Sequence, residues 1–149
     1  MVLPTTRDRV PAHTADPVNQ RIERETEERV LALAKRPEGI APRIAELDSE
    51  WDIERAIESN ASVLAFVGTA LGYFIHPYWL VLPGLVTAFL FQHAIQGWCP
   101  PVPILRRLGF RTVYEIERER HALKALRGDY GQVDRSQDKV AAALRAAAR

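Results

Sequence analysis

The chain has 149 residues and a net charge of +1, with 47% hydrophobic and 26% charged residues. These averages argue against a nucleic-acid-binding protein, which needs a concentrated basic face. A single cysteine excludes an intramolecular disulfide and a multi-cysteine zinc site. The charges are nevertheless segregated, because residues 59–105, 47 in succession, contain no Asp, Glu, Lys or Arg. Composition by segment is therefore more informative than the average.

The N-terminal region is predicted to form a tail followed by a helical arm. Residues 1–16 contain prolines and separated charges without an apolar core, and we expect a disordered tail. Residues 17–58 carry two helical patterns, over 20–36 and 42–60, separated by Pro37 and Gly39. The second helix could break near Asp48–Ser49, where an N-cap is available. Its acidic row is interpreted as a solvated helix face: Asp48, Glu50, Asp52 and Glu54.

The charge-free region predicts a two-span transmembrane helical hairpin over residues 59–98. The first span, 59–75, would be roughly 25 Å long, slightly less than a hydrocarbon core of about 30 Å. The second span, 78–98, is bracketed by Trp79 and Trp98, which are roughly 28 Å apart in a helix and match two interfacial aromatic belts. A soluble bundle is the alternative, but its core helices would carry a charged face.

Basic residues predict the orientation of the hairpin. The turn at residues 75–78 contains none, whereas six arginines lie near the other helix ends. The positive-inside rule therefore places both termini in the cytoplasm. The six arginines are Arg43, Arg55, Arg106, Arg107, Arg111 and Arg118.

Residues 99–149 are predicted to form a proline-rich turn and a C-terminal helical arm. Thr112 and Glu115 make a capping box for a helix that ends at Gly128, and an alanine-rich helix covers 136–149. The apolar stripe of the first arm is expected to dock on that of the second: Val18, Ile22, Val30 and Leu33 on Ile116, Leu123 and Leu126. The fold class is thus all-α, a membrane hairpin flanked by cytoplasmic amphipathic helices.

Small residues recur at four-residue spacing in both spans: Gly68 and Gly72 in the first, Gly84 and Ala88 in the second. Such residues allow two helix backbones to approach closely in a membrane. The partner could be the other span or another copy of the chain, and we expect a homo-oligomer. Glycine is also simply common in membrane helices, which is the alternative interpretation.

Polar residues gather in the last two turns of the second span, namely Gln92, His93 and Gln96. Polar groups inside a membrane are functional candidates by default. Interhelical hydrogen bonding is the favoured role, and solvation at the lipid headgroups or an ion or proton path are the alternatives.

Cys99 is the candidate reactive thiol. It follows Trp98 at the expected interface, and Arg106 and Arg107 lie close enough in sequence to stabilise a thiolate that would be reachable from the cytoplasm. The alternative is a small interfacial residue without chemistry. The sequence has no phosphate loop, metal-ligand spacing or nucleophile elbow, so we expect neither an enzyme nor a bound metal or cofactor.

The segment from Gln96 to Gly109 resembles the YgaP-like inner-membrane transmembrane domain family. Gly97, Cys99, Pro100, Leu108 and Gly109 match its two-helix module with a G-x-C-P segment followed by Leu-Gly, whereas Pro101 and a longer insertion depart from it. The resemblance covers roughly residues 53–110. It implies a bacterial inner-membrane location, and because the module is sometimes fused to sulfur-carrying rhodanese domains, it also strengthens the case for Cys99.

Two functions remain open from the sequence. The favoured one is a non-enzymatic membrane anchoring or interaction module, with lipid, another copy of the chain and a cytoplasmic protein as the expected partners. The alternative is a thiol-dependent protein that handles sulfur or a small anion through Cys99.

Overall fold

The computed structural model describes residues 5, 7–136 and 138–148, and all regular structure among them is helical. The predicted all-α class is therefore confirmed for these residues. They form two compact units. The first comprises the residues up to Glu23 together with Trp51–Tyr114, and the second comprises Arg24–Glu50 and the residues from Glu115 onward. This division differs from the four consecutive segments expected from the sequence, because each unit is built from two separate stretches of chain.

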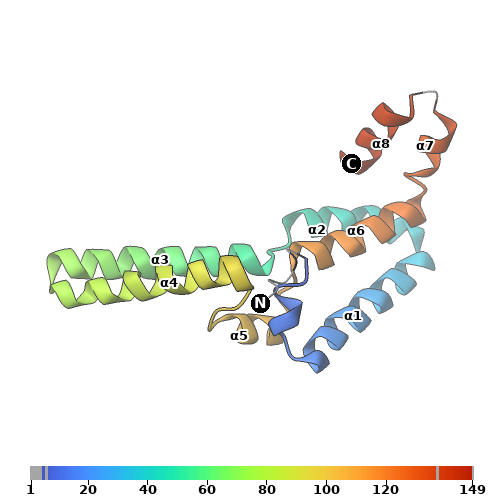
Figure 1. Ribbon diagram of the computed structural model, residues 1–149. Helices are drawn as coiled ribbons and strands as arrows, with labels where there is room; N and C mark the ends of the chain where they lie inside the picture. The colour runs from blue at the N-terminus through green and yellow to red at the C-terminus, as the bar shows by residue number, and fades with distance from the viewer. Residues whose placement is uncertain (1–4, 6, 137, 149) are drawn as a thin grey trace. The chain divides into compact units, whose positions relative to one another are not determined.

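A long antiparallel hairpin dominates the first unit. Helices α3 (Ile53–Phe74) and α4 (Val81–Gln96) lie side by side and are joined by the 3-10 turn η3 (Pro77–Leu80) (Figure 1). Helix α3 begins at Ile53 because the carboxylate of Asp52 accepts a hydrogen bond from the Arg55 backbone N–H at 2.9 Å. The predicted helix over 42–60 is therefore two helices. The break lies at residues 50–52, just after the expected position.

Close backbone packing holds the hairpin together along α3. A Cβ added to Gly68 would lie 2.6 Å from Pro83 Cδ, and one added to Gly72 would lie 2.5 Å from Leu80 Cδ2. Both glycines therefore pack within the hairpin. Gly84 differs, since a Cβ there would meet no atom within 4 Å, and Ala88 is exposed. The small residues of α4 thus face away from α3.

The surface of the hairpin is apolar. Large hydrophobic side chains are exposed along its length, among them Phe66 at 76% and Phe74 at 80% of their maximal areas. The stretch Pro77–Gln96 is long and apolar enough to cross a membrane, and only 6% of its most apolar window is buried. It is the one stretch among the described residues that passes this test.

The base of the hairpin is covered by chain segments from both sides. The N-terminal segment carries a short 3-10 helix, η1 (Pro11–His13), and the short helix α5 (Val102–Arg107) follows the proline-rich turn. They share a core of five buried residues: Val10, Ile53, Ile57, Cys99 and Val102. The expected disordered tail is therefore ordered from residue 7 onward, because Val10 anchors it, while residues 1–4 and 6 lie outside the described residues.

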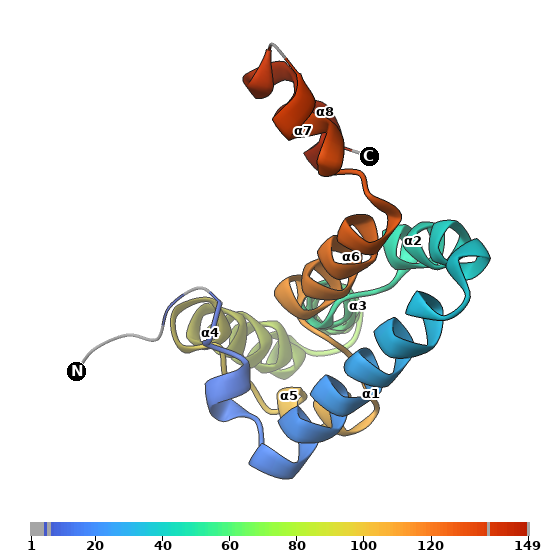
Figure 2. The same cartoon turned by 90° about the vertical axis from the view of Figure 1, so that its right-hand side faces the viewer.

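The second unit is a set of amphipathic helices. It contains the C-terminal part of α1 (Asp16–Ala34), the turn η2 (Pro37–Gly39), α2 (Ile40–Ser49) and most of α6 (Val113–Arg127), with α2 and α6 side by side (Figure 2). The short helices α7 (Gly131–Arg135) and α8 (Lys139–Ala148) follow. The core gathers residues from three helices: Ile40, Ile44, Leu47, Ile116 and Leu123, with Val30 and Leu33 against them. Docking of the arms is thus seen for Val30 and Leu33, whereas Leu126 is 48% exposed and does not join the core.

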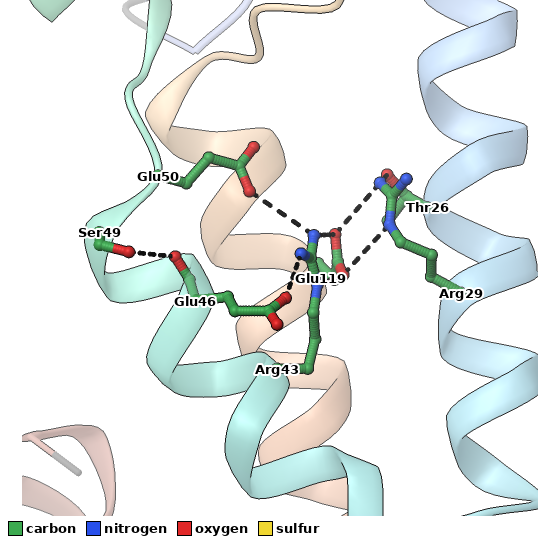
Figure 3. Close-up of polar contacts among 7 residues, drawn as sticks. All are labelled: Thr26, Arg29, Arg43, Glu46, Ser49, Glu50 and Glu119. Carbon is green, nitrogen blue, oxygen red and sulfur yellow. Dashed lines mark hydrogen bonds and ion pairs between the residues drawn. The ribbon is translucent and has the colours of Figure 1, made fainter.

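A buried carboxylate lies among the helices of the second unit. Glu119 of α6 has no exposed area. Its carboxylate accepts hydrogen bonds from Arg43 Nε of α2 at 2.9 Å and from Arg29 Nη2 of α1 at 3.3 Å (Figure 3). Arg43 also contacts Glu46 at 2.9 Å. Burial opposes the charge of Arg43, yet these carboxylates raise its pKa above the ordinary value. The cluster is therefore a paired structural network and not a vacant site.

Candidate functional site

A short hydrogen bond links the two helices of the hairpin at its base. Nε2 of His93, in the last turns of α4, lies 2.6 Å from Oε2 of Glu54, in the first turn of α3. A carboxylate can only accept a hydrogen bond, so Nε2 carries the proton. His93 is 4% exposed, which makes this a largely buried imidazole–carboxylate pair. Of the three polar residues singled out in the second span, His93 thus makes an interhelical bond.

The other two polar residues behave differently from His93. Gln92 Nε2 donates to Gln96 Oε1 at 3.5 Å, so these side chains contact each other along one face of α4. Their spacing of four residues is the ordinary spacing of neighbours on a helix surface.

The thiol of Cys99 lies against the His93 ring. Nδ1, the ring nitrogen that does not face Glu54, is buried and makes no hydrogen bond of regular geometry. In the neutral ring with its proton on Nε2, Nδ1 is an acceptor that an S–H group can use. The order carboxylate, imidazole, thiol is the arrangement in which a base activates a cysteine nucleophile.

Arg9 of the N-terminal segment binds the carboxylate of Glu54, the group at the other end from the thiol. Its Nη2 donates to Glu54 Oε1 at 2.9 Å, and its Nη1 donates to the Ala94 carbonyl near the C-terminus of α4 at 2.9 Å. A cation is favourable at that end of a helix, where the carbonyls lack partners. Burial alone would raise the pKa of Glu54, but the His93 hydrogen bond and the Arg9 charge together lower it below the ordinary value.

Gly97 makes the approach of Arg9 possible. It ends α4 in the left-handed region with φ of 79°, and its N–H donates to the His93 carbonyl at 2.7 Å. A Cβ at this position would lie 2.5 Å from the Arg9 backbone. Glycine is therefore required twice, by the backbone angle and by the close contact.

Two expectations about Cys99 are wrong. The thiol is not open to solvent, because Cys99 is 2% exposed within the hairpin-base core. Arg106, one of the two arginines expected to stabilise a thiolate, also makes its hydrogen bonds to other groups. Arg106 is fully buried and donates to Asn19 Oδ1 at 2.9 Å, to Thr14 Oγ1 at 3.2 Å and to the Phe110 carbonyl at 3.1 Å. The side chain beside the thiol is His93, and Arg106 instead fastens the N-terminal segment to α5.

A groove of about 530 Å³ runs along α3, α4 and α5 and has Cys99 in its wall. Its lining is apolar apart from Asn60 and the cysteine: Ile57, Ala61, Leu64, Leu82, Leu85, Val86, Phe89, Leu90, Pro100, Pro101, Ile104 and Leu105. Leu64, Leu85 and Ile104 are each about half exposed or more, so the groove is open along the hairpin surface.

Sequence reasoning missed Glu54 and Arg9. Glu54 was grouped with the solvated acids, and Arg9 lay in the expected tail. An antiparallel hairpin brings the first turn of its first helix beside the last turns of its second. Glu54 and His93 could therefore have been paired from the sequence, had the start of α3 been placed at Ile53.

Comparison with models of protein families, with curated proteins and with solved structures finds no match to this chain. The resemblance to the YgaP-like family therefore stays a prediction. Among residues 5, 7–136 and 138–148, no three or more His, Cys, Asp or Glu side chains are grouped to hold a metal ion. The site is best described as a buried thiol–imidazole–carboxylate chain beside an apolar groove.

Proposed function

We propose that this protein is a membrane anchoring and interaction module whose α3–η3–α4 hairpin crosses the bilayer twice. The supporting observation is the surface of the hairpin, which exposes large hydrophobic side chains over a stretch without any Asp, Glu, Lys or Arg. In water such a contiguous apolar surface is a liability, whereas in lipid it is required. The stretch Pro77–Gln96 has the length and hydropathy of a span, and the charge-free part of α3 is the other span of the proposed hairpin.

The hairpin enters from the cytoplasmic face of a bacterial inner membrane, with both termini inside. The arginines at its base and the absence of basic residues in its turn support this orientation. The amphipathic helices of the second unit are then cytoplasmic and available to a soluble partner. A YgaP-like membership agrees with this location.

Self-association is proposed through α4. Gly84 and Ala88 face away from α3, so they are the small residues that another copy can approach. Gly68 and Gly72 are already occupied by the hairpin itself. Gly84→Ile should therefore reduce self-association in a membrane two-hybrid assay, and an unchanged signal would refute this interface.

Reporter fusions at residues 1 and 149 test the membrane topology. Both are expected to report a cytoplasmic location, and the protein should remain with the membrane after alkaline carbonate extraction. An external signal from either fusion, or release of the protein by carbonate, would contradict the two-span hairpin.

A second candidate function is thiol chemistry at Cys99, because His93 and Glu54 are placed to activate it. The YgaP-like resemblance implies sulfur handling as one form of this chemistry, and small-anion handling is another. The thiol should react with a small uncharged maleimide much faster than with a charged one, since Cys99 is buried beside an apolar groove. Equal rates would mean that the thiol is open to water and that the enclosed site is incorrect.

A further inference from the structure

The groove beside Cys99 has the size and lining of a site for a hydrocarbon chain. Its volume of about 530 Å³ lies within the range of roughly 300–1,000 Å³ that small-molecule sites occupy. Aliphatic and aromatic side chains from α3, α4 and α5 form almost all of its wall. A polar or anionic ligand would lose its hydration there and gain few hydrogen bonds in return. The lining thus selects an apolar occupant.

The groove also contains a nucleophile with an assembled base. Cys99 lies in the wall, its thiol lies against His93, and the buried Nδ1 atom of that ring makes no regular hydrogen bond. Glu54 holds the protonated Nε2 at 2.6 Å, so in the neutral ring Nδ1 is the nitrogen that can accept a proton. Packing alone does not require this alignment, because a small apolar residue could occupy the position of Cys99.

We propose that Cys99 is an S-acylation site: its thiol accepts a long-chain fatty acyl group from an acyl thioester, and the groove holds the acyl chain. This inference rests on the second candidate function, a reactive thiol at Cys99, and names its substrate class. Cysteines next to a membrane span are the usual position for such a modification. The acyl chain would add hydrocarbon at the base of the hairpin, beside α5 and the proline-rich turn, which do not themselves cross the membrane in the proposed topology.

The reaction is a thioester exchange in which no atom is oxidised or reduced. Nδ1 of His93 takes the proton of the Cys99 thiol, and the sulfur attacks the carbonyl carbon of the donor. The new Cys99 S–C bond forms as the C–S bond to the donor thiol breaks, and the imidazolium returns its proton to the departing thiolate. The products are acyl-Cys99 and the donor in its thiol form.

The direct test uses the full chain in lipid nanodiscs with palmitoyl-coenzyme A as the donor. Intact-mass spectrometry should show the addition of one palmitoyl group, and neutral hydroxylamine should remove it as expected for a thioester. The chain has a single cysteine, so this adduct reports Cys99 alone. Cys99→Ser should give no hydroxylamine-sensitive adduct, and the absence of one from the unmodified sequence would overturn the proposal.

Variants of the two partner residues test the assigned roles. His93→Gln removes the base and should slow acylation at pH 7 on the order of 100-fold. Glu54→Gln removes the positioning residue and should slow it less. Both deficits should shrink above about pH 9, where a free thiol ionises without a base. A deficit that is the same at all pH values would indicate structural damage and contradict the roles of these residues.

Donor chain length tests the groove and separates the two possible failures. Leu85→Trp adds bulk at the groove wall and should slow palmitoylation at least tenfold more than it slows acetylation by acetyl-coenzyme A. Val81→Trp, on the same helix but outside the groove, is the matched control and should leave both rates unchanged. If acetylation is seen without palmitoylation, the thiol candidate survives and the acyl-chain inference fails. If neither is seen in any sample, both fail.

Discussion

The hairpin and the second unit solve the problem of helix packing in opposite ways. In the hairpin, glycines at 68 and 72 bring backbones together while large apolar side chains face outward. In the second unit, the apolar residues of α1, α2 and α6 face inward, and charged residues cover the outside. The proposed membrane location of the hairpin would account for the difference: water expels apolar surface, whereas lipid does not, so close van der Waals packing would hold the hairpin.

The two regions also differ in how they bury charged and polar side chains. The second unit encloses Glu119 completely and satisfies it with two arginines. The hairpin encloses polar groups only at its base, where Glu54 faces both His93 and Arg9. One cluster is a structural network in which both oxygens of Glu119 are paired. The other leaves a ring nitrogen for a thiol, which is the feature that distinguishes a candidate site from a support.

The largest effect is expected from Glu119→Ala. Removing this carboxylate leaves Arg43 and Arg29 without their buried partner, which should destabilise the second unit by about 3–5 kcal/mol. Glu27→Ala removes an exposed carboxylate 3.9 Å from Arg118 and should cost less than about 1 kcal/mol. Hydrogen exchange of the full chain in detergent would measure both. Equal loss of protection in α3 and α4 would show that the two regions are not independent.

A second prediction compares two glycines with positive φ. Gly97→Ala and Gly109→Ala both impose a backbone cost of about 1–2 kcal/mol. Only the new Cβ at position 97 meets the Arg9 backbone, while that at 109 meets no atom within 4 Å. Gly97→Ala should therefore be the more destabilising and should expose the N-terminal segment to limited proteolysis. Similar proteolysis of both variants would argue against the contact with Arg9.

Within the hairpin, Gly68→Leu should destabilise by about 1–3 kcal/mol, because the new side chain overlaps Pro83. Gly84→Leu adds the same side chain to an open face and should leave the hairpin unchanged. Thermal unfolding in mild detergent, followed by circular dichroism, would compare them. The opposite ranking would mean that the two helices pack through different faces.

The smallest effect concerns pH. Because the folded-state pKa of Glu54 is lowered, its charge stabilises the fold above the unfolded value of about 4.3, and this contribution is lost as the pH falls through the lower folded value. Glu54→Gln should abolish that part of the acid destabilisation. Unfolding midpoints of both proteins between pH 3 and 6 would measure it. Parallel pH curves for the two proteins would contradict the lowered pKa.

Local patterns in the sequence determined the helical class, the apolar hairpin region and the two arms. Each of these features is contained in one continuous stretch of sequence and can be recognised without knowing the tertiary contacts. The stretches are the 47 residues without charge, the turn around Pro77 and the helix stop at Pro37 and Gly39. The ends of the helices depend on more than these local patterns. The chain offered acceptable caps at several positions, and Asp52 was selected in the structure.

Only the tertiary structure decided which polar residues meet. Arg9, Glu54, His93 and Cys99 come from three separate segments. The hairpin can pair Glu54 with His93 once the start of α3 is known, but nothing in the sequence spacing places Arg9 beside them. The same holds for Glu119, whose place in the sequence resembles that of its exposed neighbours. Burial and pairing depend on contacts between distant segments. Local sequence therefore determines which secondary structure a residue can adopt. Contacts with distant segments determine whether its side chain is buried and which group it pairs with.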